Sequence, residues 1–153
     1  MNISLSKIIT NFDPYMGRII AIDYGKKRTG LAVSDPMKII AGGLITLSSP
    51  TVISFIKEYV KKEEVDLIIL GEPRQMSYEP SENMQRVELF KKKLTQSIPS
   101  IPVKMVDERF TSVMAHQAMI QGGLKKTERQ NKELIDELSA TILLQSYLET
   151  LRL

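Results

Sequence analysis

The sequence contains no cysteine. This absence excludes disulfide frameworks, thiolate zinc sites and cysteine nucleophiles, and it suits a reducing cytosol. The chain also lacks any apolar run near the roughly 20 residues that are needed to cross a bilayer. Its first 15 residues mix asparagine, serine, lysine and aspartate among apolar residues, so they lack the apolar core of a signal peptide. We therefore expect a cytoplasmic protein without a membrane segment.

Histidine and excess charge are scarce as well. His116 is the only histidine, and a lone histidine in a helix is more typical of an ordinary surface position than of a general base. The 21 Lys and Arg residues against 18 Asp and Glu residues give a net charge of +3, which permits a nucleic-acid partner but does not require one. Basic residues cluster at 26–28, 91–93 and 125–129, and each cluster taken alone indicates only a solvated surface.

The length of 153 residues suits one domain that can bury its own core. No internal repeat or low-complexity segment indicates a different organisation. The turn signal Asp13-Pro14 separates an N-terminal extension from the rest of the chain. We expect this extension to comprise residues 1–15 and a single domain to comprise residues 16–153.

Three β-rich apolar segments with short connections come first, which indicates antiparallel neighbours. Helices and strands then alternate, and strands that a helix connects pair in parallel. The predicted strands are 18–23, 30–34, 44–47, 65–70 and 102–106, and the predicted helices are 51–63, 82–96, 111–121 and 131–150. The sequence therefore predicts an α/β fold with a mixed five-stranded sheet, three antiparallel strands followed by parallel ones, flanked by helices.

Acidic residues stand where predicted elements end or begin. Asp23 ends the first strand, the Asp107-Glu108 pair follows the fifth, and Asp136 lies in the first turns of the last helix. Strand ends at one edge of an open sheet face a common crevice, which is the usual place for ligands. Carboxylates that converge there repel one another unless a cation neutralises them, and their oxygens select Mg²⁺ or Mn²⁺. Two such ions can clamp the attacking and leaving oxygens in phosphodiester cleavage.

Each acid also has a purely structural interpretation. Asp23 fits a turn, Asp107 fits the end of a strand, and Asp136 fits a favourable charge near a helix N-terminus. Successive strand residues face opposite sides of a sheet, so Asp107 and Glu108 cannot both point into one site. Beside Asp23 and Asp136, we favour Glu108 as the third catalytic acid and metal ligand, with Asp107 as the second choice.

Four stretches of the chain carry a family resemblance. They are 23–36 (DYGKKRTGLAVSDP), 71–76 (GEPRQM), 106–112 (VDERFTS) and 136–148 (DELSATILLQSYL). Their order and spacing, over about residues 17–148, resemble the YqgF/RuvX family of RNase H-like proteins. The family's loop after the fourth strand usually continues toward an Asp-Gly, where this chain has Ser77-Tyr78-Glu79.

The resemblance implies an RNase H-like fold. It also implies Asp23, the Asp107-Glu108 pair and Asp136 as metal-binding acids, with Mg²⁺ or Mn²⁺ as the cofactor. Members of the family are described as nucleases that mature the 5′ end of the small-subunit ribosomal RNA precursor, or as Holliday junction resolvases. We therefore expect a metal-dependent endonuclease that processes the 5′ end of pre-16S rRNA in ribosome biogenesis.

Basic residues near these acids suit contacts with phosphate. Arg28 and Arg109 can pair with phosphate oxygens through the fork of the guanidinium group. Six further residues can follow a nucleic-acid backbone: Lys26, Lys27, Lys125, Lys126, Arg129 and Lys132. Lys132 precedes Asp136 by one helical turn, so it can instead stabilise that carboxylate.

Three other functions stay open. A Holliday junction resolvase would act on branched DNA as a symmetric dimer, and the sequence does not distinguish a monomer from a homodimer. A non-catalytic RNA-binding factor of ribosome assembly would keep the fold without turnover. A nucleotide-phosphate binder of the actin or sugar-kinase type also has an Asp-x-Gly hairpin, but two such domains close around ATP and 153 residues supply only one.

Overall fold

The computed structural model describes residues 17–73, 82–107, 117, 120–123 and 131–152. The strands are β1 (Arg18–Tyr24), β2 (Arg28–Ser34), β3 (Ala41–Ser48), β4 (Val65–Glu72) and β5 (Val103–Asp107). The helices are the short 3₁₀ helix η1 (Ser49–Thr51), then α2 (Val52–Lys62), α3 (Glu82–Ser97) and α6 (Lys132–Thr150). The predicted extension and most of the predicted helix 111–121 lie outside the described residues.

The five strands form one mixed sheet in the order β3-β2-β1-β4-β5. The pairs β1–β2 and β2–β3 are antiparallel, because short connections join these strands. The pairs β1–β4 and β4–β5 are parallel; in the chain, α2 precedes β4 and α3 connects β4 to β5. The mixed five-stranded sheet that the sequence predicts is therefore confirmed.

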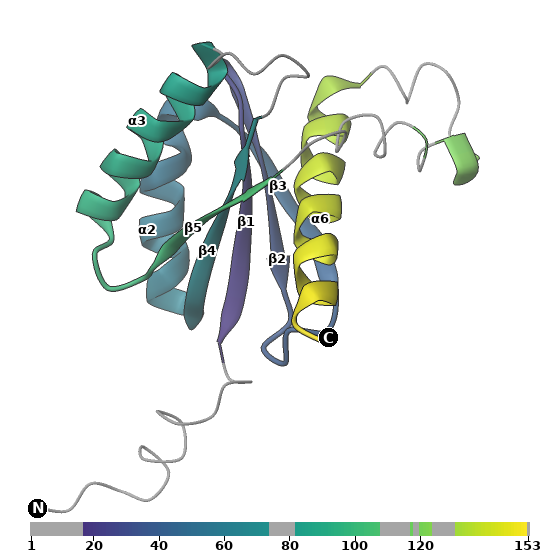
Figure 1. The fold of residues 1–153 in the computed structure, drawn as a ribbon, viewed down its shortest axis with the longest axis horizontal. Helices are drawn as coiled ribbons and strands as arrows, with labels where there is room; N and C mark the ends of the chain where they lie inside the picture. Colours follow the sequence, from purple (N-terminus) through teal and green to yellow (C-terminus); the bar gives the residue numbers. More distant parts are fainter. Residues whose placement is uncertain (1–16, 74–81, 108–116, 118–119, 124–130, 153) are drawn as a thin grey trace, which may run out of the picture.

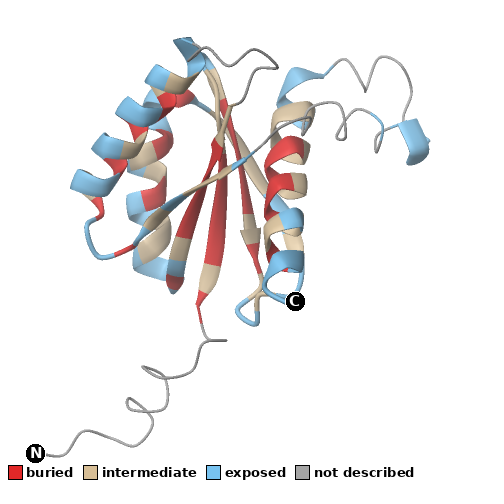
Figure 2. Cartoon of the chain, viewed as in Figure 1, coloured by how far each residue is buried: buried red, intermediate tan, exposed pale blue. Residues whose placement is uncertain are grey.

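The sheet has helices on both faces, which Figure 1 shows from the side. Helices α2 and α3 cover one face, here called the α3 face, and α6 covers the other, here called the α6 face. Along β1, Ile20 and Ile22 belong to the apolar layer under α2 and α3, whereas Ile19 and Ala21 belong to the layer under α6. Figure 2 shows the buried residues concentrated in the sheet and on the inner sides of the helices. A strand that is buried on both faces explains the uninterrupted apolar run of the sequence.

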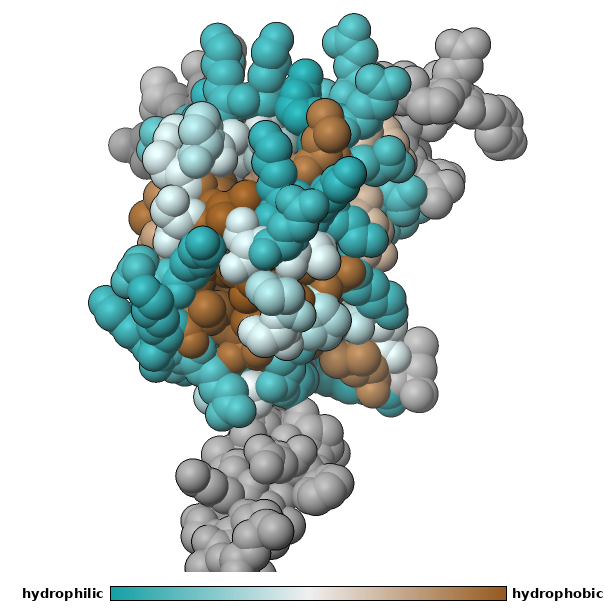
Figure 3. Space-filling view, turned by 90° about the vertical axis from the view of Figure 1, so that its left-hand side faces the viewer, coloured by the Kyte–Doolittle hydropathy of each residue, from teal (hydrophilic) through white to brown (hydrophobic). Residues whose placement is uncertain are grey.

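The outer side of α3 is open to solvent. Lys92 and Lys93 are exposed there, in agreement with a solvated interpretation of the basic cluster 91–93. The exposed Leu89 lies on the same helix. Figure 3 shows this side of the molecule, where hydrophilic side chains surround smaller hydrophobic areas.

Asn131 caps the N-terminus of helix α6. The Asn131 side chain precedes the helix and accepts hydrogen bonds from the backbone N–H groups of Glu133 and Leu134, at 3.0 and 3.4 Å. These bonds satisfy donors that have no partner inside the helix. The hydroxyl of Thr46 on β3 donates to the carbonyl oxygen of Glu133 at 2.7 Å, so the first turn of α6 is fixed to the edge strand.

Strand β2 begins two residues earlier than the sequence predicts. The sequence places Arg28 in the basic turn, whereas in the structure Arg28 is the first residue of β2 and pairs with Ser48 of β3. Of the basic cluster 26–28, only Lys26 and Lys27 stay in the turn between β1 and β2. The strand begins earlier because β2 pairs with β3 along its whole length, and local sequence patterns do not show this pairing.

Within the described ranges, no helix combines the length and the apolar character that a membrane span requires.

Candidate active site

Asp23 lies near the end of β1 with its side chain on the α6 face. It pairs with Gly30 of β2 in the antiparallel ladder, and directly opposed residues of such a ladder share a face. Two and four positions earlier, Ala21 and Ile19 pack under α6. The next residue, Tyr24, points to the α3 face and stacks on Phe90 of α3 with ring centroids 4.1 Å apart.

Asp136 reaches the same place from the second turn of α6. A Cβ atom added to Gly30 would overlap the backbone carbonyl oxygen of Asp136, so the helix backbone lies directly against this glycine. Only a residue without a side chain allows this approach. Because Gly30 is also the partner of Asp23, the two predicted acids occupy neighbouring positions at one end of the α6 face.

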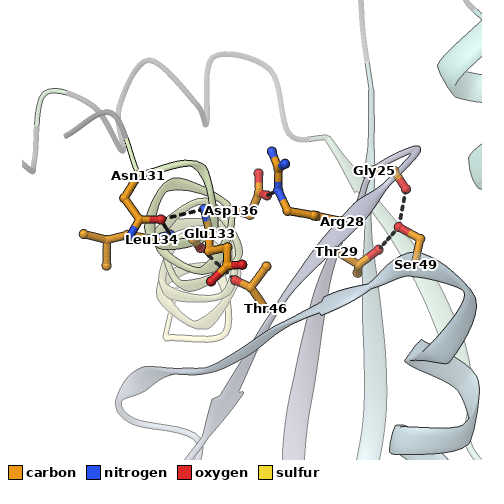
Figure 4. A network of polar contacts seen from close by, with 9 residues as sticks. All are labelled: Gly25, Arg28, Thr29, Thr46, Ser49, Asn131, Glu133, Leu134 and Asp136. Atoms are coloured by element: carbon orange, nitrogen blue, oxygen red, sulfur yellow. Dashed lines mark hydrogen bonds and ion pairs between the residues drawn. The ribbon is translucent and has the colours of Figure 1, made fainter. Parts of the chain in front are cut away.

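The Asp136 carboxylate forms an ion pair with Arg28, in which the Arg28 Nε–H donates to Oδ2 at 3.0 Å. The exposed fractions of the two side chains are 37% for Arg28 and 26% for Asp136. In Figure 4 the guanidinium group stands beside Asp136, between the start of α6 and the turn after β1. The structure thus joins a residue that the sequence assigns to phosphate with one that it assigns to metal. Lys132, the alternative partner of Asp136, is exposed at the first position of α6.

Asp107 lies on the other face of the sheet. Along β5, Val103 and Met105 pack with the α3-face layer, while Val106 packs with the α6-face layer. Lys104 also faces α6, since its Nζ lies 5.2 Å from the centre of the Tyr147 ring. The alternation therefore turns Asp107 toward the α3 face, away from Asp23 and Asp136. Glu108, the favoured third acid, lies outside the described residues and stays a prediction.

A further acid, which was not identified from the sequence, lies at this edge of the sheet. Glu72 ends β4 and pairs with Asp107 in the parallel ladder, on the same face. The signal was available, because Glu72 ends a strand whose preceding residues are mostly apolar and buried, as Asp23 lies near the end of β1. Its position on the α3 face separates it, like Asp107, from the Asp23–Asp136 pair.

Ser49 fixes the turn between β1 and β2 through hydrogen bonds to its backbone. The Ser49 hydroxyl donates to the carbonyl oxygen of Gly25 at 2.5 Å, and the Ser49 N–H donates to the carbonyl oxygen of Lys27 at 2.9 Å. Since the one hydroxyl proton of Ser49 is used, Thr29 is the donor in the 2.8 Å bond between the two hydroxyl groups. Both hydroxyl residues are buried, and Figure 4 shows them beneath the turn. Lys26 and Lys27 are exposed on this fixed turn, whereas nothing in the sequence pattern pointed to Ser49.

The remaining predicted residues are not described. Arg109, Lys125, Lys126, Arg129 and His116 lie outside the described ranges, so their roles stay predictions. Among the residues that the structure does describe, no group of three or more acidic or histidine side chains is arranged to hold a metal ion. The carboxylates of Asp23 and Asp136 are hard oxygen donors of the kind that suits Mg²⁺ or Mn²⁺. Mg²⁺ usually keeps several water ligands beside one or two carboxylates, and Glu108 is the predicted candidate for a third protein donor.

Comparisons with known proteins agree with this architecture. The chain is similar to a protein of Azobacteroides pseudotrichonymphae with the name "Putative pre-16S rRNA nuclease", at 59% identity over 137 residues, 90% of this chain and 99% of that protein. A Bacteroides fragilis protein of the same name is 59% identical over 138 residues, 90% of this chain and 100% of its own.

Solved structures support the fold. RuvC of Thermus thermophilus superposes with a TM-score of 0.54 at 15% identity, and its complex with a Holliday junction substrate superposes with 0.55 at 16%. Each match covers 88% of this chain and 96% of the RuvC chain, so the fold is RNase H-like, as predicted. A family model described as "RuvX: Holliday junction resolvase" matches residues 17–150. The chain belongs to the RuvX family.

Proposed function

We propose that this protein is a divalent-metal-dependent endonuclease that processes the 5′ end of pre-16S rRNA. The names of its relatives and the family model support nuclease activity. The observation that carries the proposal is that Asp23 and the backbone of Asp136 both adjoin Gly30, on one face of an RNase H-like sheet. Basic residues on the adjoining turn provide the counterpart for a phosphate backbone.

Asp23, Asp136 and Glu108 are the residues that would hold the metal. A bound Mg²⁺ or Mn²⁺ would lower the pKa of a coordinated water and stabilise charge on the phosphoryl oxygens. The chain itself supplies orientation. Asp23 sits on a central strand and the backbone of Asp136 is seated on Gly30, so both carboxylates are held by rigid elements.

Lys26 and Lys27 would bind the phosphates that flank the scissile bond. They are exposed on a turn that Ser49 fixes to the junction between β3 and α2. Because the backbone of this turn is already ordered, binding a phosphate there loses little conformational entropy. Arg109, Lys125, Lys126, Arg129 and Lys132 would extend this surface along the RNA.

Replacing Asp23 tests the proposal. We expect Asp23→Asn to reduce cleavage of a pre-16S transcript more than about 100-fold in Mg²⁺ or Mn²⁺, because the substitution removes a charged ligand. RNA binding and the circular dichroism spectrum should be retained. Asp107→Asn is the matched control, since Asp107 lies on the opposite face, and it should cleave at a rate close to that of the wild type. Wild-type cleavage by Asp23→Asn would exclude this site.

The family description favours a second candidate function, the resolution of Holliday junctions. A junction resolvase must place two sites on a two-fold substrate, so it acts as a dimer. A four-way DNA junction in the same assay distinguishes the two activities: paired symmetric cuts favour resolution, and a single cut in the RNA favours processing. Salt-sensitive RNA binding that Asp23→Asn leaves unchanged, with no cleavage in any metal, would instead indicate a non-catalytic assembly factor.

A further inference from the structure

Arg28 and Asp136 are bonded to each other, although each suits a different part of a substrate complex. The guanidinium group suits a phosphate, and the carboxylate suits a divalent cation. Their 3.0 Å bond joins residues that are 108 positions apart in the chain. The pairing is therefore a product of the fold and not of local sequence.

Both partners are anchored through their backbones. Arg28 opens β2 and pairs with Ser48 of the neighbouring strand, and the turn before it is fixed by Ser49. On the other side, the carbonyl group of Asp136 rests on Gly30. Because the backbones are fixed, changing partners requires only rotation of the two side chains.

The Arg28–Asp136 ion pair is also accessible to ions that could compete for either partner. The Arg28 side chain is 37% exposed and the Asp136 side chain is 26% exposed, so a hydrated cation or a phosphate can reach the pair. Ion pairs that are this exposed contribute little net stability, because water competes with the partner. The described bond uses the Nε–H of Arg28, and the terminal nitrogens carry four more N–H donors that can meet a phosphate.

We propose that Arg28 is a positioning residue, which binds the Asp136 carboxylate as long as no metal ion is bound there. In the metal-free protein, Arg28 neutralises and orients the Asp136 carboxylate. A divalent cation held by Asp136 would compete with the guanidinium group for this carboxylate, and the released Arg28 side chain would then be free to pair with a phosphate of the substrate. This inference rests on the proposed function, because it takes Asp136 as a metal ligand.

The affinity of the free protein for metal should depend on Arg28 even without catalytic turnover. A guanidinium group beside Asp136 occupies one carboxylate oxygen and repels an incoming cation, so it lowers the affinity of the free protein for metal. Removing the charge of Arg28 should raise that affinity. If Arg28 only orients Asp136 and stays in place when metal binds, removing it should leave the affinity unchanged or lower it.

A titration with Mn²⁺ followed by electron paramagnetic resonance measures this affinity without nucleic acid. We expect Arg28→Gln to bind Mn²⁺ several-fold more tightly than the wild type, yet to bind RNA more weakly when Mg²⁺ is present. Arg18→Gln is the matched control: Arg18 pairs with Glu63 at 3.4 Å near the opposite end of β1, and its loss changes the net charge equally. This control should bind Mn²⁺ as the wild type does.

The outcomes separate this inference from the proposed function. If Asp136→Asn weakens Mn²⁺ binding while Arg28→Gln does not strengthen it, the placeholder role is wrong and the metal site stands. If Asp136→Asn leaves Mn²⁺ binding unchanged, both are wrong. In the wild-type protein, the NMR signal of the Arg28 Nε–H, assigned by its loss in Arg28→Gln, should shift when Mg²⁺ is added. A signal that does not move at saturating Mg²⁺ would also overturn the exchange.

Discussion

At the scale of single residues, Gly30 allows helix α6 to approach the strand that pairs with Asp23. This glycine pairs with Asp23 across the ladder and lies against the backbone of Asp136. A side chain at this position cannot be accommodated by rotating a neighbour, because the obstructing atom belongs to a helix backbone. The close approach of α6 to β2 at this point therefore depends on the absence of a side chain at Gly30.

We expect Gly30→Ala to push the start of α6 away from the sheet. Overpacking of this kind typically costs about 1–3 kcal/mol, and cleavage should fall because Asp136 moves with the helix. Gly43→Ala is the matched control on β3, since its added Cβ would meet the flexible Glu137 side chain, which can move aside. Unfolding in urea and cleavage of a pre-16S transcript measure the two effects. Equal stability and activity of both variants would contradict the role given to Gly30.

At the scale of elements, local patterns were sufficient to predict the strands and helices. The apolar runs and the helical spacing identified all five strands, α2, α3 and α6, because each signal lies within a few residues. The start of β2 was misjudged at Arg28, since its ladder partner Ser48 is distant in sequence. The Arg28–Asp136 ion pair and the close packing of the Asp136 backbone against Gly30 could not be predicted either, because both form only when α6 packs on the sheet.

The loop between β2 and β3 gives a prediction about pH. Burial would raise the pKa of Asp35, but hydrogen bonds from the N–H groups of Ile40, Ile39 and Met37 outweigh it, and the pKa lies below its usual value. The folded state therefore favours ionised Asp35. This stabilisation is present above the pKa of the unfolded chain and is lost as the pH falls through the lower pKa of the folded state.

Urea unfolding of the wild type and of Asp35→Asn, repeated from neutral pH to acid pH, checks this sign. We expect the difference in stability between the two proteins to shrink as the pH falls, because the wild type loses the contribution that the variant never had. A difference that stays constant across the acid range would show that the ionised carboxylate does not stabilise the loop.

At the scale of the whole molecule, the net charge of +3 is too small to explain nucleic-acid binding by itself. The proposal places RNA affinity in local groups at one end of the sheet. Exposed lysines elsewhere, such as Lys61 and Lys62 at the end of α2, provide the comparison. If RNA bound to any basic surface, Lys26 and Lys27 would contribute to RNA affinity as much as Lys61 and Lys62. If RNA follows a defined path over the β1–β2 turn, only Lys26 and Lys27 should contribute.

Replacing Lys26 and Lys27 together by alanine should weaken RNA binding and flatten its dependence on salt. Each lost phosphate contact lowers the slope of log K against log salt by about 0.7 for single-stranded RNA. The double alanine variant of Lys61 and Lys62 removes the same charge and should keep the wild-type slope. Fluorescence anisotropy at several salt concentrations measures both, and equal slopes for the two variants would argue against the β1–β2 turn as the RNA path.

The most direct measurement is the mapping of 16S rRNA 5′ ends in cells that have lost the wild-type protein and make only a substituted one. If Asp23 serves RNA cleavage, cells with Asp23→Asn should accumulate precursors with extended 5′ ends, while cells with Asp107→Asn should contain mature ends. Mature 5′ ends in the Asp23→Asn cells, at wild-type abundance, would contradict the account.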